Sequence, residues 1–179
     1  MFISIEYFSL KIELPYVNAL YIRSRFLYSR YIHFFCTICY HLEKRTVYIV
    51  FDKLKDNLKN SYSPYSNFKV SAIVVTKDGK EFTGVNIENA SYGATVCAER
   101  CAIFKAVSEG YRPKDLEELH LMVGSGSIGM PCFMCRQVIT EFFEQDKKIY
   151  CYSTNGDVEV YKVSDLCPNP FGPDDLDLK

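Results

Sequence analysis

The sequence has no excess of charge of either sign and no long apolar run free of charges. Lys and Arg total 21 of the 179 residues and Asp and Glu total 22, so the chain lacks the positive field typical of proteins that bind nucleic-acid phosphates. No uncharged apolar run approaches the roughly 20 residues that span a bilayer. Glu6, Lys11 and Glu13 interrupt the segment where a signal peptide would be apolar. We therefore expect a cytoplasmic protein with reduced cysteines and with no membrane or nucleic-acid partner.

Glycine is absent from the first 50 residues, since the first glycine of the chain is Gly79. The Tyr and Phe residues that crowd this stretch follow neither the strand period nor the helix period. We interpret 1–50 as an N-terminal extension, which is either a poorly packed part of the protein or sequence from upstream of its true start. The lack of methionine between Met1 and Met122 argues against a later start at a Met codon. The folded domain is expected over 51–179.

Regular patterns begin at Phe51, which shares one helical face with Leu54 and Leu58 before a stop at Ser63 and Pro64. Asp78 and Gly79 predict a tight hairpin between two β-rich runs, and strands and helices then alternate. The expected strands are 68–75, 81–87, 119–124, 147–153 and 158–163, and the two core helices are 97–110 and 131–143, the second opened by Pro131 in its first turn. This order predicts an α/β fold, with three α/β/α layers around a mixed five-stranded sheet.

Eight reduced cysteines indicate metal binding rather than a disulfide framework. Cys97 and Glu99 flank Ala98 at the start of one expected helix, and Cys132 and Cys135 lie in the first turn of another. Three thiolates leave the fourth position of a tetrahedral Zn²⁺ open for water, which is typical of a catalytic site, and helix N-termini favour thiolates. Glu99 is not needed as a ligand and is free to carry protons. The alternative is a structural zinc half-site, with Glu99 as a dipole partner.

A second group, His33, Cys36, Cys39 and His41, also mimics a zinc site. It lies in the aperiodic first 50 residues and has no second half-site at the usual spacing, so we expect adventitious binding there.

The residues 63–110, SPYSNFKVSAIVVTKDGKEFTGVNIENASYGATVCAERCAIFKAVSEG, and 131–138, PCFMCRQV, resemble the cytidine deaminase family in its small, three-cysteine, homotetrameric form. The resemblance covers about 51–176. It implies the cytidine deaminase fold and one Zn²⁺ per chain. It also implies hydrolysis of cytidine and 2′-deoxycytidine to uridine and 2′-deoxyuridine with release of ammonia, a step of pyrimidine salvage. The implied partners are a free nucleoside and three copies of the same chain.

The resemblance also implies substrate-binding residues. Asn86 and Glu88 match the pair that binds the ribose 3′-hydroxyl, and strand alternation is expected to put them on one face. Phe68 matches the aromatic residue that packs on the cytosine ring, and Ala98 matches a further substrate contact. The alternatives are a core position for Phe68 and a turn-forming, solvated pair for Asn86 and Glu88.

Arg100 matches an arginine that offsets the third thiolate, as the net negative charge of Zn²⁺ with three thiolates requires, and Arg136 is a weaker candidate. Tyr92 and Phe171 resemble residues that reach a neighbouring subunit's pocket, although simple packing is an alternative for both.

The sequence departs from the family at Phe133, where glycine is usual, and this ring either crowds the pocket or points back into the core. Cys167 replaces a more usual leucine and is expected to be a small buried hydrophobe. Cys101 and Cys151 are expected in the core, and His120 on a strand without an evident partner.

In the implied mechanism zinc activates water, Glu99 takes its proton, C4 is attacked, and Glu99 protonates ring N3 before the amine departs. Three competing hypotheses remain at this point. They are a deaminase of another aminated heterocycle, a catalytically silent zinc module if Phe133 blocks the pocket, and a nucleic-acid editor.

Overall fold

The structure is a computed structural model that describes residues 49–176. The predictions made for the first 48 residues, including the group of His33, Cys36, Cys39 and His41, lie outside the described residues. None of the helices within 49–176 has the length and apolar character needed to cross a bilayer.

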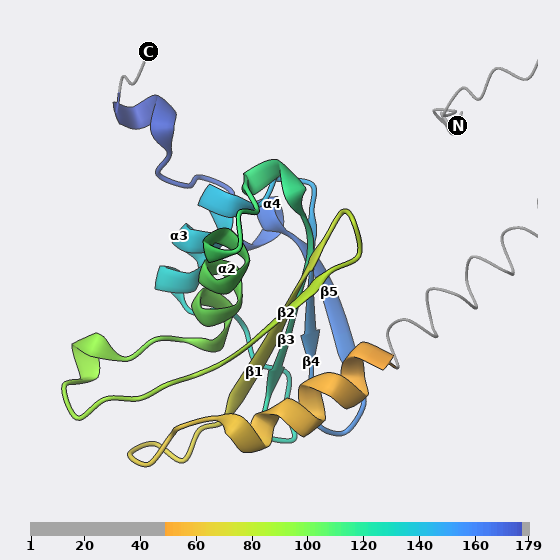
Figure 1. Ribbon diagram of the computed structural model, residues 1–179, viewed down its shortest axis with the longest axis vertical. Coiled ribbons are helices and arrows are strands. Elements are labelled where there is room, and N and C mark those ends of the chain that lie inside the picture. The colour runs from red at the N-terminus through yellow and green to blue at the C-terminus, as the bar shows by residue number, and fades with distance from the viewer. Residues whose placement is uncertain (1–48, 177–179) are drawn as a thin grey trace, which may run out of the picture. The chain divides into compact units, whose positions relative to one another are not determined.

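A mixed sheet of five strands forms the centre of the domain (Figure 1). Its order is β2-β1-β3-β4-β5, in which β3 and β4 are parallel and the other neighbours are antiparallel. The bounds are β1 Val70–Thr76, β2 Glu81–Val85, β3 Leu116–Val123, β4 Lys148–Tyr152 and β5 Val158–Lys162. The predicted mixed five-stranded sheet is confirmed.

Side chains alternate between two cores because successive residues of a strand point to opposite faces. On β1, Ala72 and Val74 join one buried cluster, whereas Ile73 joins the other. The first cluster also takes residues from α2 (Ala98–Ser108), α3 (Phe133–Phe142) and α4 (Val163–Leu166). The second packs under a helix whose described part covers 49–57, here called the first helix, which continues as η1 (Leu58–Asn60). Helices on both faces give the predicted three layers (Figure 1).

The first helix belongs to the domain. Val50, Leu54 and Leu58 are buried against the sheet, where they meet Met122 and Tyr152. The spacing of these residues gives the helix one apolar face, as the sequence pattern predicts.

The face of the sheet under the first helix carries a buried polar network. His120 is 1% exposed, stacks on Tyr150 with ring centroids 4.5 Å apart, and lies 3.0 Å from the Tyr152 hydroxyl through Nδ1. Its Nε2 lies 3.2 Å from Glu118, which also accepts a hydrogen bond of 3.0 Å from Tyr150. The sequence showed no evident partner for His120, but the structure gives it three, which are Glu118 on its own strand and Tyr150 and Tyr152 on β4, about 30 residues further along the chain.

Candidate active site

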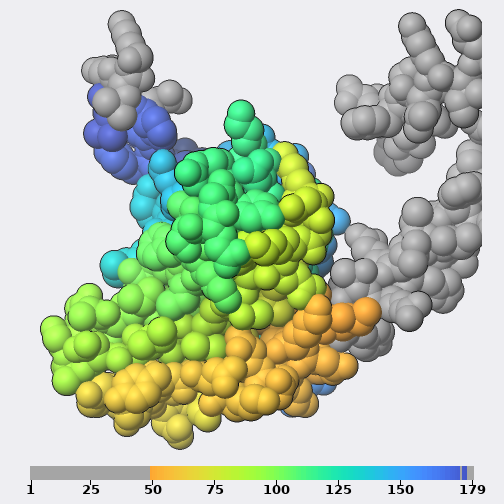
Figure 2. Space-filling model, viewed as in Figure 1, coloured from red at the N-terminus to blue at the C-terminus, as the bar shows by residue number. Residues whose placement is uncertain are grey.

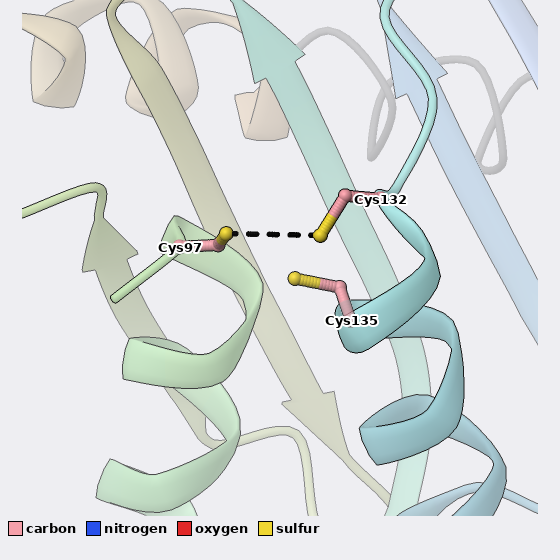
Figure 3. A group of neighbouring side chains, drawn as sticks. All are labelled: Cys97, Cys132 and Cys135. Atoms are coloured by element: carbon pink, nitrogen blue, oxygen red, sulfur yellow. Dashed lines mark hydrogen bonds between the residues drawn. The ribbon is translucent and has the colours of Figure 1, made fainter. Parts of the chain in front are cut away.

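Three cysteine side chains converge between the starts of α2 and α3 (Figure 3). Cys97 is the N-cap of α2, Cys132 is the N-cap of α3, and Cys135 is buried in the first turn of α3. Their sulfur atoms all lie within 4.8 Å of one another, and the Sγ atoms of Cys97 and Cys132 are 3.8 Å apart. Tetrahedral Zn–S bonds of about 2.3 Å require sulfurs about 3.8 Å apart. The donor set therefore fits one Zn²⁺, and residues 49–176 supply three ligands for its four tetrahedral positions.

The helix starts that supply these ligands differ slightly from the predicted ones. Pro131 lies just before the cap of α3 rather than in its first turn, because Cys132 takes the extended N-cap conformation and the helix begins at Phe133. The cysteines nevertheless lie at two helix N-termini, where the helix dipole favours thiolates.

The charge at the cluster is set by hydrogen bonds to Cys97. Contacts from Cys135, then Arg100 and Cys132, lower the pKa of the Cys97 thiol to about 5. Arg100 Nη2 lies 3.7 Å from Cys97 Sγ and donates a 3.0 Å hydrogen bond to the carbonyl of Thr95. Among the described residues Arg100 Nε has no hydrogen-bond partner although it is buried. The guanidinium thus lies beside the thiolate whose charge it was predicted to offset.

Glu99 is the second residue of α2 and is only 4% exposed. Burial raises the pKa of its carboxyl to about 7, and the negative charge of Cys97 adds to the effect. A carboxyl with a pKa near neutrality can both accept and release a proton at the pH of a cell. Ala98, by contrast, has no exposed surface, so its predicted contact with substrate stays a prediction.

Asn86 and Glu88 do not lie on one strand as predicted, because β2 ends at Val85. The chain beyond it makes isolated bridges at Ile87 with Tyr62 and with Val96. The bridge to Val96 joins the segment of Asn86 and Glu88 to the residue just before Cys97. Two backbone hydrogen bonds between Ile87 and Val96, of 2.9 and 3.0 Å, therefore hold the segment of Asn86 and Glu88 next to the start of α2.

Both side chains hold the loop over 61–69. Asn86 accepts hydrogen bonds from Val70 N at 2.8 Å and Ser61 Oγ at 2.5 Å, and it donates one of 2.8 Å to the carbonyl of Phe68. Glu88 accepts from the backbone N–H groups of Tyr65 at 2.9 Å and Ser66 at 3.2 Å, and from the Ser66 hydroxyl. These bonds, chiefly that of the Ser66 hydroxyl, lower the pKa of Glu88 and keep it ionised. Figure 2 shows the loop and the segment that carries Asn86 and Glu88 packed side by side.

Phe68 is half-exposed, so it is not a core residue. Its backbone is fixed on both sides, since its N–H donates to Ser66 Oγ at 2.9 Å and its carbonyl accepts from Asn86. Asn67, just before it, has a φ of 54°, in the left-handed region that asparagine tolerates better than most residues. The loop therefore presents an aromatic ring from a rigid backbone.

Tyr92 and Phe171 are both exposed, at 72% and 58%. Tyr92 lies in η2 (Tyr92–Ala94) and its ring meets Tyr65 edge to face, with centroids 5.9 Å apart. The carbonyl of Phe171 accepts a 2.8 Å hydrogen bond from Gln137 on α3, and the chain then continues into η4 (Pro173–Leu176). Neither ring is buried within the described part of the chain.

The Phe133 ring neither crowds the cysteines nor enters the core. It is 84% exposed, and the guanidinium of Arg136 lies 5.0 Å from its centre. Residues i and i+2 of an α-helix point in directions about 200° apart around the helix axis, so Phe133 and Cys135 face opposite ways. Arg136 donates to the carbonyls of Pro131 and Leu166 at 2.9 Å each.

Of the remaining cysteines, Cys151 is buried as predicted. Cys101 and Cys167 are only half-buried, so their predicted full burial is wrong. Cys101 lies on α2 where β2 approaches most closely, and Cys167 is the C-cap of α4.

Sequence reasoning missed Ser66. A serine in a loop has no characteristic spacing, and its partner Glu88 is 22 residues away. The run of polar residues between Ser61 and Asn67 was the available signal, because such runs often hydrogen-bond to backbone groups.

Comparison with known proteins agrees with this geometry. The family model described as the cytidine and deoxycytidylate deaminase zinc-binding region matches residues 45–153. A cytidine deaminase of Halalkalibacterium halodurans is 43% identical over 118 residues, which are 66% of this chain and 88% of that protein. One of Mycobacterium tuberculosis is 40% identical over 116 residues, which are 65% of this chain and 82% of that protein.

A solved structure gives the same result for the fold. The crystal structure of cytidine deaminase from Burkholderia pseudomallei superposes with a TM-score of 0.67 at 40% identity, and it covers 69% of this chain and 98% of that one. The family model covers more than half of the chain, the solved structure has the same fold, and three cysteines converge in the matched zinc-binding region. The chain belongs to the cytidine deaminase family.

Proposed function

We propose that this protein is a zinc-dependent cytidine deaminase that hydrolyses cytidine and 2′-deoxycytidine to uridine and 2′-deoxyuridine, with release of ammonia. The observation that carries the proposal is the buried Glu99 carboxyl beside three convergent cysteines at two helix starts. The names of the relatives from Halalkalibacterium and Mycobacterium support the substrate.

Cys97, Cys132 and Cys135 would hold the metal in this proposal, and a bound Zn²⁺ would supply Lewis acidity, which makes a water molecule acidic enough to attack C4 of cytosine. Glu99 would take one proton of that water and deliver it to ring N3, and after the attack it would take the remaining proton from the new C4 hydroxyl and deliver it to the departing amine, which leaves as ammonia. A pKa of about 7 supports both halves of this transfer, since neither protonation state of Glu99 is strongly favoured at neutral pH. Arg100 holds positive charge beside Cys97, which limits the negative charge of the three thiolates.

The sugar contacts follow from the hydrogen-bonding capacity that Asn86 and Glu88 still have. Asn86 uses both lone pairs of Oδ1 and one N–H of Nδ2, so one N–H donor remains. Glu88 Oε2 accepts two N–H groups and Oε1 accepts one hydroxyl, so one acceptor site remains. A spare donor and a spare acceptor together match the two hydrogen-bonding functions of a hydroxyl group, which supports binding of the ribose 3′-hydroxyl. These contacts do not involve the 2′ position of the sugar. They require a nucleoside whose 3′-hydroxyl is free.

Phe68 packs on the cytosine ring in this proposal, and its half-exposed position on a fixed backbone supports the role. Tyr92 and Phe171 complete the pocket of a neighbouring copy in a homotetramer. The exposure of both aromatic rings leaves them available for such an interface. The mass in solution, measured by light scattering, tests the tetramer directly. We further propose a cytoplasmic role in pyrimidine salvage, where reducing conditions keep the ligand cysteines as thiols.

The test of the reaction compares the full chain with its Glu99→Gln variant at equal, measured zinc content. Absorbance changes of cytidine and 2′-deoxycytidine report deamination. We expect the parent to convert both nucleosides and the variant to lose at least about 10²-fold in kcat, because the amide cannot carry the proton. A parent that holds about one zinc per chain and converts neither nucleoside would overturn the cytidine assignment.

A further inference from the structure

The hydroxyl of Ser66 links the two substrate-binding elements of the proposed site. It donates to Glu88 Oε1 and accepts a 2.9 Å hydrogen bond from the backbone N–H of Phe68. Glu88 belongs to the segment after β2, whereas Phe68 lies on the loop that leads into β1. A single side chain thus contacts the carboxylate assigned to the sugar and the residue assigned to the base.

The direction of the Ser66 hydroxyl hydrogen is fixed by its neighbours. A serine oxygen can accept and donate at once, and here the N–H of Phe68 takes an acceptor position. The hydrogen therefore points at Glu88 Oε1. The left-handed conformation of Asn67, with φ 54°, creates the turn that brings the N–H of Phe68 back to this oxygen.

The carboxylate of Glu88 is in turn held at both oxygens. Two backbone N–H groups fix Oε2, but Oε1 has Ser66 as its one protein donor among the described residues. Oε1 is also the oxygen with an acceptor site to spare. Loss of the Ser66 hydroxyl would remove this donor, so that only the two backbone bonds to Oε2 would orient the carboxylate within the described part of the chain.

We infer that Ser66 is a positioning residue for the nucleoside sugar, which orients Glu88 Oε1 so that this oxygen accepts the hydrogen of the 3′-hydroxyl. The inference rests on the proposed function, because it assigns Glu88 to the sugar. Ser66 itself does not contact the reacting atoms.

The test compares Ser66→Ala with the parent on cytidine and on 3′-deoxycytidine, which lacks only the hydroxyl in question. We expect kcat/KM for cytidine to fall about tenfold, mainly through KM, as for the loss of one hydrogen bond to a charged group. For 3′-deoxycytidine the same substitution should change kcat/KM by less than about twofold, because Glu88 then has no hydroxyl to bind. In a Glu88→Gln background, Ser66→Ala should likewise add less than about twofold.

Two control variants separate positioning from general damage. Ser66→Thr keeps a hydroxyl and should retain at least about a third of the activity on cytidine. Ser108→Ala removes an exposed hydroxyl that bonds only to the carbonyl of Lys105 at the end of α2, and it should have no effect on either substrate.

Equal losses on cytidine and 3′-deoxycytidine would overturn the inference, as would an unchanged activity of Ser66→Ala on cytidine or a full additional loss in the Glu88→Gln background. A parent that deaminates neither nucleoside would instead overturn the proposed function, and the role of Ser66 with it.

Discussion

Replacing Gly84 with alanine should displace the helix that carries Glu99. A Cβ added at Gly84 would lie 2.4 Å from the carbonyl oxygen of Ala98 and 2.5 Å from the backbone nitrogen of Ala102. Ordinary carbon–oxygen contacts are about 3.3 Å or longer, so α2 and β2 would have to separate by about 1 Å. Both clashing atoms belong to the backbone of α2, which cannot yield as a flexible side chain can.

The expected cost in the free energy of unfolding is about 3 kcal/mol, at the upper end of the usual range for overpacking. For a domain of this size the midpoint of thermal unfolding should fall by roughly 10 °C. Glu99 moves with α2, and a misplacement of about 1 Å at a catalytic group lowers kcat/KM by about 10²-fold. Thermal unfolding by circular dichroism and the cytidine assay measure the two effects.

Gly93→Ala is the matched control, since nothing lies within 4 Å of a Cβ added there and its φ is not left-handed. It should unfold within about 2 °C of the parent. If Gly84→Ala behaved like this control in both assays, the close approach of β2 and α2 would not be what positions Glu99.

Three further predictions concern the metal, the first helix and Phe133. Cys135→Ser should reduce bound zinc, measured by atomic absorption, well below one per chain. Cys167→Ser, which lies outside the cluster, should leave bound zinc unchanged. Equal zinc contents in the two variants would refute the ligand assignment. Leu54→Ala, which empties a fully buried site under the first helix, should lower the free energy of unfolding by about 3 kcal/mol in urea titrations, while the exposed Lys55→Ala should change it by less than about 0.5 kcal/mol. Phe133→Gly should leave kcat/KM for cytidine within about threefold of the parent, because the ring is exposed and turned away from Cys135. A gain in kcat/KM above about tenfold would mean that the ring obstructs the pocket.

The sequence was sufficient to predict the layers and the metal cluster, because both depend on local patterns. β-rich runs bounded by turn residues identified the five strands, and the spacing of the cysteines at two predicted helix starts indicated a zinc site. The boundary of β2 was wrong by two residues, since Asn86 uses its side chain to bond Val70 N at the position where a strand partner would use its backbone.

The contacts that sequence reasoning could not supply join residues far apart in the chain. Ser66 and Glu88 are separated by 22 residues, and His120 and Tyr152 by 32. Neither pair follows a helix or strand period, so no pattern indicates that they meet. The exposed position of Phe133 also required the structure, because the choice between core and pocket depended on the direction of one ring.

The network around His120 bears on how the parallel pair β3 and β4 finds its alignment. Hydrophobic alternation alone tolerates a slip of two residues, because each side chain then keeps its face of the sheet. In the observed register His120 lies opposite Tyr150, and Tyr152 and Glu118 meet the same ring from either side. A slip of two residues would change which of these side chains face one another, and each buried polar group left without a partner would cost about 1–3 kcal/mol. The polar side chains under the first helix thus select one alignment where the apolar pattern would accept several.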